Sequence, residues 1–317
     1  MSAFDRRKGI TAALSSALFL GIVPIFGKAA ILSGFSPYAV IVIRTGIAAL
    51  LMLTVMILWK RQFLYIYPVG LVGCLLAGLI NGLGSVLYYS ALSRLNAGIG
   101  HLLYSFYPLF VAFWLLLDRQ SITRVTMIRL ILSVPAMVLL LRASSGQIDL
   151  IGALMMLGSA VLYALHLLIN QRILYEAPAP TVTLYTLLGM AGTVLLAYLL
   201  LDARLPAPGV AWWTVLCMAL ITFLSRFSLF TGIKHLGGLQ TALLGLSEIF
   251  VTLLASAVFL GERLSLAQWL GALLLTVSLV LVGYDRVTQQ KRYTTGWLSW
   301  LNPVKIPSAD FNWPERP

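Results

Sequence analysis

Two residues of opposite charge lie deep inside long apolar stretches of the sequence. Of the ten acidic residues, only Glu248 is well inside such a stretch, about ten residues from either end and so roughly 15 Å deep in a helix. Arg226 lies about eight residues from the end of the preceding stretch, or roughly 12 Å deep. Ionisable groups at this depth are costly and usually face a cavity or a partner. Consecutive membrane helices run antiparallel, so the two charges can lie at the same depth in the membrane. This predicts either a structural ion pair or a binding or coupling site for a solute or a proton.

Polar side chains recur at helical spacing in neighbouring stretches. Asn81 belongs to one such stripe, and Tyr163 and His166 share a face of another. A shift of 141 residues places Tyr107 at the position that corresponds to Glu248. Polar residues also help membrane helices to pack, and a lone histidine there is more often a packing residue than a proton relay. In our interpretation a common pocket is lined by Glu248, Arg226, Asn81, Tyr107, Tyr163 and His166.

Other conspicuous residues are assigned structural roles by default. Arg44 and Lys28 lie near the ends of their stretches, where long side chains can extend to the membrane surface. Cys74 and Cys217 lie within apolar runs, where cysteine behaves as a small core residue. Prolines inside three stretches are expected to interrupt the helices, as in the broken helices that border transport sites. These prolines are Pro24, Pro108 and Pro135.

The composition excludes an ordinary soluble domain. Hydrophobic residues make up 60% of the 317 positions and charged residues only 10%, whereas soluble proteins carry roughly 25% charged residues. The mean hydropathy is +0.94. The net charge of +12 does not indicate a nucleic-acid partner, because the basic residues form no clustered face. The sequence has no H-E-x-x-H, G-x-S-x-G, C-x-x-C or Walker motif, so we predict no catalytic residue, no metal and no cofactor.

Nearly charge-free stretches recur along the chain. A helix needs about 20 apolar residues to cross a bilayer, and each stretch is long enough. We therefore predict an all-α polytopic membrane protein with ten transmembrane helices. The expected spans are residues 10–32, 38–59, 67–93, 97–118, 124–142, 149–170, 181–201, 210–233, 238–260 and 266–284.

The ten predicted spans divide into two five-helix repeats, residues 10–142 and 149–284. A shift of 141 to 143 residues brings several identical residues into correspondence. These pairs are Gly9 and Gly152, Ser16 and Ser159, Cys74 and Cys217, and Leu95 and Leu236. Because five is odd, the second repeat must enter the membrane from the opposite face, which is the inverted repeat common in secondary transporters.

The Lys and Arg residues between spans predict an orientation. Most of them fall on one side if residues 1–9 are cytoplasmic, as the positive-inside rule requires. An even number of spans then places both termini in the cytoplasm. The expected location of the protein is an inner or plasma membrane. The cytoplasmic tail of residues 285–317 is expected either to be loosely ordered or to lay residues 297–301 (Trp-Leu-Ser-Trp-Leu) in the headgroup layer.

Several motifs near the end of the second half are specific enough to suggest a family. They are Ile233-Lys234-His235-Leu236, Leu246-Ser247-Glu248, Phe259-Leu260-Gly261-Glu262-Arg263-Leu264-Ser265 and Gln268-Trp269-Leu270-Gly271. Together they resemble the second half-repeat of the EamA family of the drug/metabolite transporter superfamily. The first half is more faintly similar, in Tyr107-Pro108-Leu109-Phe110 and in Arg44. The sequence departs from the family pattern at Ile249, where a proline is usual, and at Ser121, which stands where the second half has Glu262.

The resemblance implies a ten-helix transporter of small metabolites, often an exporter of amino acids or related compounds. It favours a secondary active or facilitative carrier that works by alternating access. The alternatives are a membrane scaffold that transports nothing and a membrane-embedded enzyme without a recognisable motif. The expected partners are a small-molecule substrate, protons as a candidate coupling ion and the lipid bilayer, and the chain is expected to be a monomer or a homodimer.

Overall fold

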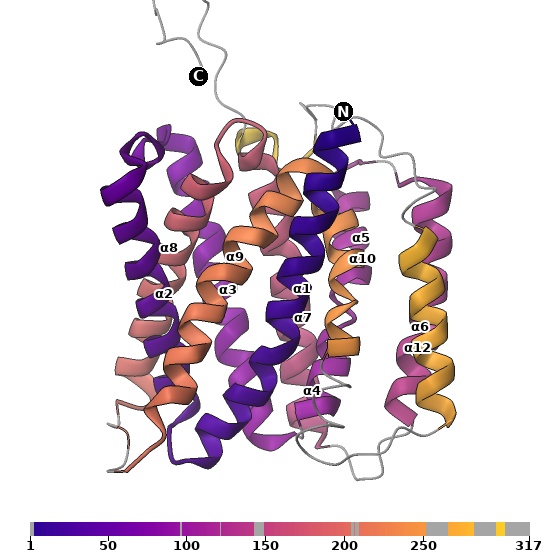
Figure 1. The fold of residues 1–317 in the computed structure, drawn as a ribbon, viewed down its shortest axis with the longest axis horizontal. Helices are drawn as coiled ribbons and strands as arrows, with labels where there is room; N and C mark the ends of the chain where they lie inside the picture. Colours follow the sequence, from indigo (N-terminus) through magenta and orange to yellow (C-terminus); the bar gives the residue numbers. More distant parts are fainter. Residues whose placement is uncertain are drawn as a thin grey trace, which may run out of the picture.

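The structure is a computed structural model that describes residues 3–95, 97–120, 122–142, 149–203, 206, 209–251, 266–281 and 296–301. Within these ranges the chain is helical and forms no strand. The helices stand side by side in one bundle, and the start of α1 and the short helix η3 lie at the same end of it (Figure 1). We refer to this end as the η3 end.

The elements follow one another with short connections. In chain order they are α1 (Ala3–Leu32), α2 (Pro37–Trp59), η1 (Arg61–Leu64), α3 (Pro68–Arg94), α4 (Ala97–Tyr104), α5 (Tyr107–Leu117), α6 (Arg124–Arg142), α7 (Leu150–Leu174), α8 (Ala179–Leu201), α9 (Trp212–Leu236), α10 (Gly238–Gly245), α12 (Leu266–Val280) and η3 (Ser299–Leu301).

Local sequence signals explain where several helices begin and end. Ser36 caps α2, because its hydroxyl accepts the N–H of Ala39 at 3.1 Å, and a proline occupies the first helical position. Asp149 caps α7 by accepting the N–H groups of Ile151 and Gly152. Helix α9 ends at Gly237, whose φ of 87° is readily adopted only by glycine.

Six helices are long and apolar enough to cross a membrane, judged by length and composition. They are residues 5–32 of α1 together with α2, α3, α7, α8 and α9, and they coincide with the first three and the sixth to eighth predicted spans. Some helices extend several residues beyond the predicted spans: α1 already begins at Ala3, and α7 continues to Leu174. The fifth predicted span is α6, which is 19 residues long and includes Arg129.

Two of the predicted spans are discontinuous. The fourth is divided into α4 and α5 by a turn at residues 105–106, just before Pro108. The ninth turns at residues 246–247, after α10, and is helical again from Glu248 to residue 251; the rest of that span lies outside the described residues. Pro24 and Pro135 do not break their helices, contrary to the prediction, since α1 and α6 run through them.

The two breaks have the same hydrogen bonding. At the first, the N–H of Phe106 donates to the carbonyl of Leu103 at 3.3 Å, and at the second the N–H of Ser247 donates to the carbonyl of Leu244 at 3.0 Å. Each is a bond to the third preceding residue instead of the fourth, which tightens the helix into a 3-10 turn. The donors and the acceptors are both separated by the 141 residues of the sequence shift.

Helix contacts are exchanged between the two halves of the chain. Helix α1 packs on α9 as α7 packs on α3, and α2 packs on α9 as α8 packs on α3. The hydroxyl of Ser16 donates to the carbonyl of Ser225 at 3.1 Å, and that of Ser159 donates to the carbonyl of Gly84 at 2.7 Å. The serines that the shift pairs therefore make corresponding bonds, each to the other half of the chain.

Part of the C-terminal tail is docked on the bundle. Leu298 and Leu301 are buried, and the N–H of Leu298 donates to Asp118 Oδ1 at 3.3 Å. Trp297 and Trp300 remain about half exposed. The expectation of a loosely ordered tail was therefore wrong for the two leucines, because an apolar site formed by α3 and α7 accepts Leu301. The alternative that this segment lies in the headgroup layer stays a prediction.

The docked segment covers a buried ion pair. Arg172, in the last turn of α7, donates to Asp118 Oδ2 through Nη2 at 2.5 Å and through Nε at 3.2 Å, and both side chains are 0% exposed. Gln120 donates to the same carboxylate oxygen at 2.7 Å. This cluster ties the ends of α5 and α7 to the C-terminal segment.

Candidate functional site

A cavity of about 60 Å³ lies inside the bundle. Its walls come from α1, α2, α3, α4, α7 and α9 and from the residues that follow α10. Asn81 on its wall is 13 residues from either end of α3 by the helix bounds, which corresponds to about 20 Å of helix on each side. Its charged or titratable lining residues, tyrosines apart, are Arg44, His101, Arg226 and Glu248.

Glu248 begins the helical residues that follow the second break, and its side chain is almost completely buried. Its Oε1 lies 3.8 Å from Nε2 of His101, which α4 carries. Burying a carboxylate costs free energy that only specific partners offset. The turn at residues 246–247 therefore places a carboxylate beside an imidazole at the cavity wall.

Arg226 reaches the same cavity from α9. Its guanidinium carbon lies 5.6 Å from the ring centroid of Tyr163, close enough for a cation–π contact. Arg226 and Glu248 both line the cavity but form no ion pair within 4.0 Å of each other. The structure thus brings the two predicted charges to one site without the direct pair that was the structural alternative.

Arg44 does not extend to the surface as the sequence analysis assumed. It is 5% exposed, lines the cavity, lies 5.0 Å from the ring centroid of Tyr89 and donates to Thr222 Oγ1 at 3.1 Å. The assumption failed because α2 turns this face toward α9 and not toward the surroundings. Lys28 does serve structure, since its ammonium donates to the carbonyls of Leu92 and Leu95 at the end of α3.

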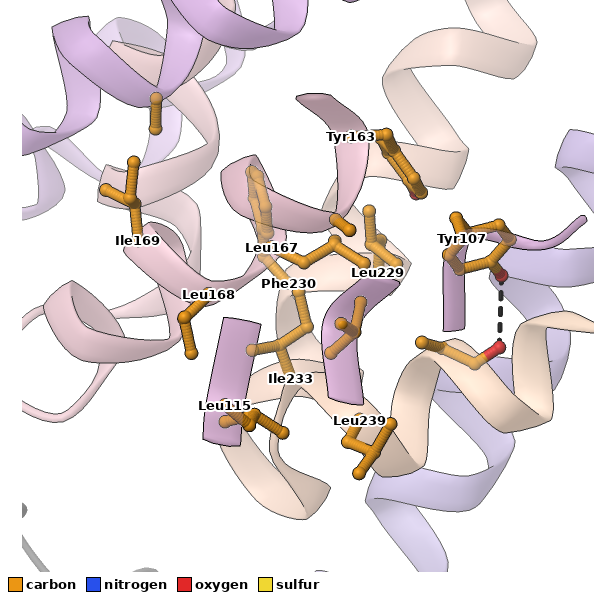
Figure 2. Close-up of a cluster of buried hydrophobic side chains, with 14 of the residues drawn as sticks. Tyr107, Leu115, Tyr163, Leu167, Leu168, Ile169, Leu229, Phe230, Ile233 and Leu239 are labelled. Carbon is orange, nitrogen blue, oxygen red and sulfur yellow. Dashed lines mark hydrogen bonds between the residues drawn. The ribbon is translucent and has the colours of Figure 1, made fainter. Parts of the chain in front are cut away.

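Two of the other four predicted residues line the cavity. Asn81 does so while its amide donates to Met190 Sδ at 3.2 Å, and Tyr163 does so beneath Arg226. Tyr107 instead lies behind the wall. Figure 2 shows its hydroxyl pointing to the carbonyl of Ala242, to which it donates at 3.1 Å.

His166 also lies behind the wall. Its Nδ1 is 3.1 Å from the carbonyl of Ala77 and 3.0 Å from the amide nitrogen of Asn170. Its ring is stacked against that of Tyr163, with the centroids 5.8 Å apart. His166 therefore borders the site behind Tyr163 and does not line the cavity itself.

Sequence reasoning missed most of an aromatic cluster around the cavity. Tyr104 contacts the rings of Tyr88, Tyr107 and Tyr163, at centroid distances of 5.1, 5.6 and 5.3 Å. Tyr88 follows Asn81 by seven residues and Tyr104 precedes Tyr107 by three, so helical spacing could have identified both. It gives no reason to expect Tyr89, which follows Tyr88 directly. These rings make the walls amphipathic, which suits solutes with both apolar and polar parts.

The interior toward the η3 end is packed with apolar side chains. Leu115, Leu167, Phe230 and Ile233 are among the buried residues that fill it, as Figure 2 shows. The cavity thus has no wide path toward this end. Its volume of about 60 Å³ holds only a few water molecules, so a metabolite needs a wider conformation than this one.

No metal centre is evident in the described part of the chain, which has no group of three or more His, Cys, Asp and Glu side chains that could hold an ion. Cys74 is buried, as expected. Cys217 is exposed, so the prediction of a core position for it was wrong: it lies on a face of α9 that the bundle does not cover.

The fold and the enclosed charges define the class, a multi-pass helical membrane protein with an internal polar site. The model of the EamA-like transporter family matches residues 7–142 and again residues 150–284. The chain therefore belongs to the EamA-like transporter family and is a membrane transporter, which confirms the resemblance seen in its motifs. The motif of residues 259–265 and the departure at Ser121 lie outside the described residues.

Known proteins agree with this assignment. The uncharacterized transporter sll1319 of Synechocystis sp. is 26% identical over 230 residues, which cover 68% of this chain and 67% of that protein. A solved crystal structure is 17% identical and superimposes with a TM-score of 0.68 over 90% of this chain and 98% of its own. At that identity the second likeness concerns the fold alone.

Proposed function

We propose that this protein moves a small polar metabolite, such as an amino acid or a related compound, across the inner or plasma membrane by alternating access. The observation that carries the proposal is the internal cavity lined by buried charged and titratable groups from both halves of the chain: Arg44 and His101 from the first half, Arg226 and Glu248 from the second. Burying four such groups around empty space serves stability poorly and ligand binding well.

The proposed architecture is ten transmembrane helices in two inverted repeats, residues 10–142 and 149–284. Support comes from the two helix breaks, each of which has a hydrogen bond to the third preceding residue. The hydrogen bonds that Ser16 and Ser159 each make to the other half of the chain also support it. The family model also matches once in each half. In carriers of this design the two repeats rock against each other around a site near the middle of the membrane.

The packing suggests which side of the site is closed. The apolar residues between the cavity and the η3 end must separate before a solute can leave in that direction. Basic side chains such as Lys60, Arg61 and Arg124 lie in connections and helix starts at that end, so it is the cytoplasmic end by the positive-inside rule. Both termini are then cytoplasmic. Export is favoured by the family resemblance.

Protons are the candidate coupling ion. On the described cavity wall, Glu248 and His101 are the one acid and base that lie within 4.0 Å of each other. Loss or gain of a proton at this pair changes the charge of the cavity, which alters the free energy of binding an ionic solute. Whether the carrier works as a monomer or as a homodimer does not affect this scheme.

The test compares the medium of cells that overproduce the wild type with that of cells producing Glu248→Gln. This change keeps the shape of the side chain and removes its charge. We expect a solute that accumulates with the wild type and not with the variant, at equal amounts of protein in the membrane. Glu176→Gln is the matched control, because Glu176 lies in the connection between α7 and α8, away from the cavity.

The solute found in this way is then tested in liposomes that contain only the purified protein. Uptake with the wild type and none with Glu248→Gln would support a carrier. Transport would be contradicted, and a scaffold favoured, if no solute differed in amount, in the cells or in the medium, between cells that produce the wild type and cells that lack the protein. Normal proton-dependent flux with Glu248→Gln would remove Glu248 from the coupling mechanism.

A further inference from the structure

Two guanidinium groups face the cavity from different halves of the chain. Arg44 on α2 and Arg226 on α9 are 5% and 6% exposed, and both line the cavity. The guanidinium carbon of each lies over a tyrosine ring, 5.0 Å from the centroid of Tyr89 for Arg44 and 5.6 Å from that of Tyr163 for Arg226. A cation–π contact with a ring leaves guanidinium N–H groups that can still donate to a ligand.

Three of the six guanidinium nitrogens of these arginines are buried without a hydrogen-bond acceptor in the protein. Arg44 uses Nη1 to donate to Thr222, but its Nε is buried without a hydrogen-bond partner. Arg226 has both Nε and Nη1 in that state. Buried donors are satisfied in nearly all native structures, and exceptions call for an explanation such as a missing ligand.

The charge around the cavity is also unbalanced. Its described wall carries two guanidinium groups and one carboxylate, that of Glu248. Glu248 lies next to His101 and forms no ion pair with Arg226. A ligand that brings oxygen acceptors and negative charge would satisfy the free donors and the excess positive charge together.

We propose that Arg44 and Arg226 form an anion subsite that binds a carboxylate group of the transported solute. This inference rests on the proposed function and narrows its substrate class to metabolites with at least one carboxylate. A carboxylate is planar and offers two oxygens, which match the paired N–H groups of a guanidinium edge. Glu248, on the same cavity, then accepts the ammonium group of an amino acid.

The subsite also accounts for the small volume of the cavity. The free space of about 60 Å³ lies between side chains that already reach toward it, so the bound group must be compact. The remainder of the solute is accommodated by the surrounding tyrosines when the cavity widens. Selection in this scheme depends on the carboxylate, and the rest of the solute is recognised less strictly.

The test measures binding directly on the purified full-length protein in detergent. The probes are the common L-amino acids and, for each, the amine that remains when the carboxylate is removed, such as ethylamine for L-alanine. We expect amino acids to raise the melting temperature of the wild type and their matched amines to leave it unchanged. The proposal would be overturned if the amines stabilised the protein as strongly as the amino acids do. It would also be overturned if none of the carboxylate-bearing probes raised the melting temperature.

Variants assign the effect to the two arginines. Arg44→Gln and Arg226→Gln are each expected to weaken binding of a stabilising amino acid about tenfold or more, as for loss of a charge-assisted hydrogen bond. Arg226→Lys keeps the charge without the fork and is expected to bind with intermediate affinity. The matched control is Arg61→Gln, since Arg61 is exposed in η1 and far from the lining residues.

A folding defect would not obscure the result. Gel filtration and the melting temperature without ligand report on folding for every variant, and Arg226→Lys replaces Arg226→Gln if the latter aggregates. Unchanged affinity in folded Arg44→Gln and Arg226→Gln would refute the subsite. Transport of solutes without a carboxylate would refute the subsite alone, whereas carboxylate binding without any transport would refute only the proposed function.

Discussion

Arg172 and Arg226 are both buried arginines in long helices, but their surroundings differ. Near the η3 end, Arg172 donates twice to Asp118, and that carboxylate also accepts from Gln120 and from the N–H of Leu298. In the cavity, Arg226 contacts the ring of Tyr163 and has two nitrogen atoms without an acceptor. One charge is enclosed by partners, and the other faces empty space.

The difference separates charges that hold the bundle together from charges that serve a ligand. A buried pair that has lost one partner is strongly destabilising, because the other charge stays buried without compensation. A buried charge that already lacks partners contributes little stability, and proteins keep such groups mainly where function requires them. Equal substitutions in the two regions should therefore have unequal effects.

The largest contrast is expected between Arg172→Gln and Arg226→Gln. The first change leaves the carboxylate of Asp118 buried without its guanidinium and should reduce stability by about 3–5 kcal/mol. The second loses one cation–π contact, worth about 0.5–2 kcal/mol, but removes unsatisfied donors that cost a similar amount. Thermal unfolding in detergent should show a much lower midpoint for Arg172→Gln and a nearly unchanged midpoint for Arg226→Gln. Equal losses would mean that the cavity charges are structural after all.

A smaller contrast is expected within the docked C-terminal segment. Leu301 is fully buried beside α3 and α7, whereas its neighbour Trp300 is about half exposed. Leu301→Ala should cost about 2–5 kcal/mol, as for other buried leucines, and Trp300→Ala much less. The same melting experiment measures both. A greater loss for Trp300→Ala would show that this segment is held from outside, by the lipid or detergent surface, and not by its leucines.

The sequence predicts the cavity charges because of a simple energetic rule. Hydrocarbon solvates charge so poorly that a carboxylate and a guanidinium deep in apolar stretches must face the protein interior. In the structure, Glu248 and Arg226 both line the same cavity. The residues paired by the 141 to 143-residue shift also have matching contacts. Gly9 lies against Leu236 as Gly152 lies against Leu95, since close approach of two helices requires a small residue at corresponding places.

What the sequence does not reveal depends on how helices are rotated and where they break. Arg44 lies near the start of α2, where a long side chain can turn either to the surface or inward, and only the packing of α2 on α8 and α9 decides between them. Pro24 and Pro108 are both prolines in apolar runs, but only the second adjoins a break. There Tyr107 crosses close to Gly245 and donates to a carbonyl of α10, a long-range contact that local pattern cannot supply.

The smallest effect is expected at the opposite end of the bundle, where Asp149 caps α7 and forms an exposed ion pair with Arg94 at 3.2 Å. The N–H of Gly152 and, after it, the guanidinium of Arg94 hold the pKa of Asp149 below its ordinary value of 3.8. A carboxyl whose pKa is lowered by folding adds stability above its unfolded pKa and loses that contribution as the pH falls through the folded pKa.

Asp149→Asn tests this directly, because asparagine keeps a capping oxygen and removes the charge. The wild type should melt slightly higher than Asp149→Asn at neutral pH. The difference should begin to shrink as the pH falls to about 3.8 and vanish once the pH is below the folded pKa. Added salt should also reduce it, since exposed pairs are screened. Asp149→Ala should melt lower than Asp149→Asn, because it also loses the cap. A difference between the wild type and Asp149→Asn that persists in acid and in high salt would mean that even this exposed charge has a role other than capping and pairing, and the division between structural and ligand-binding charges would have to be redrawn.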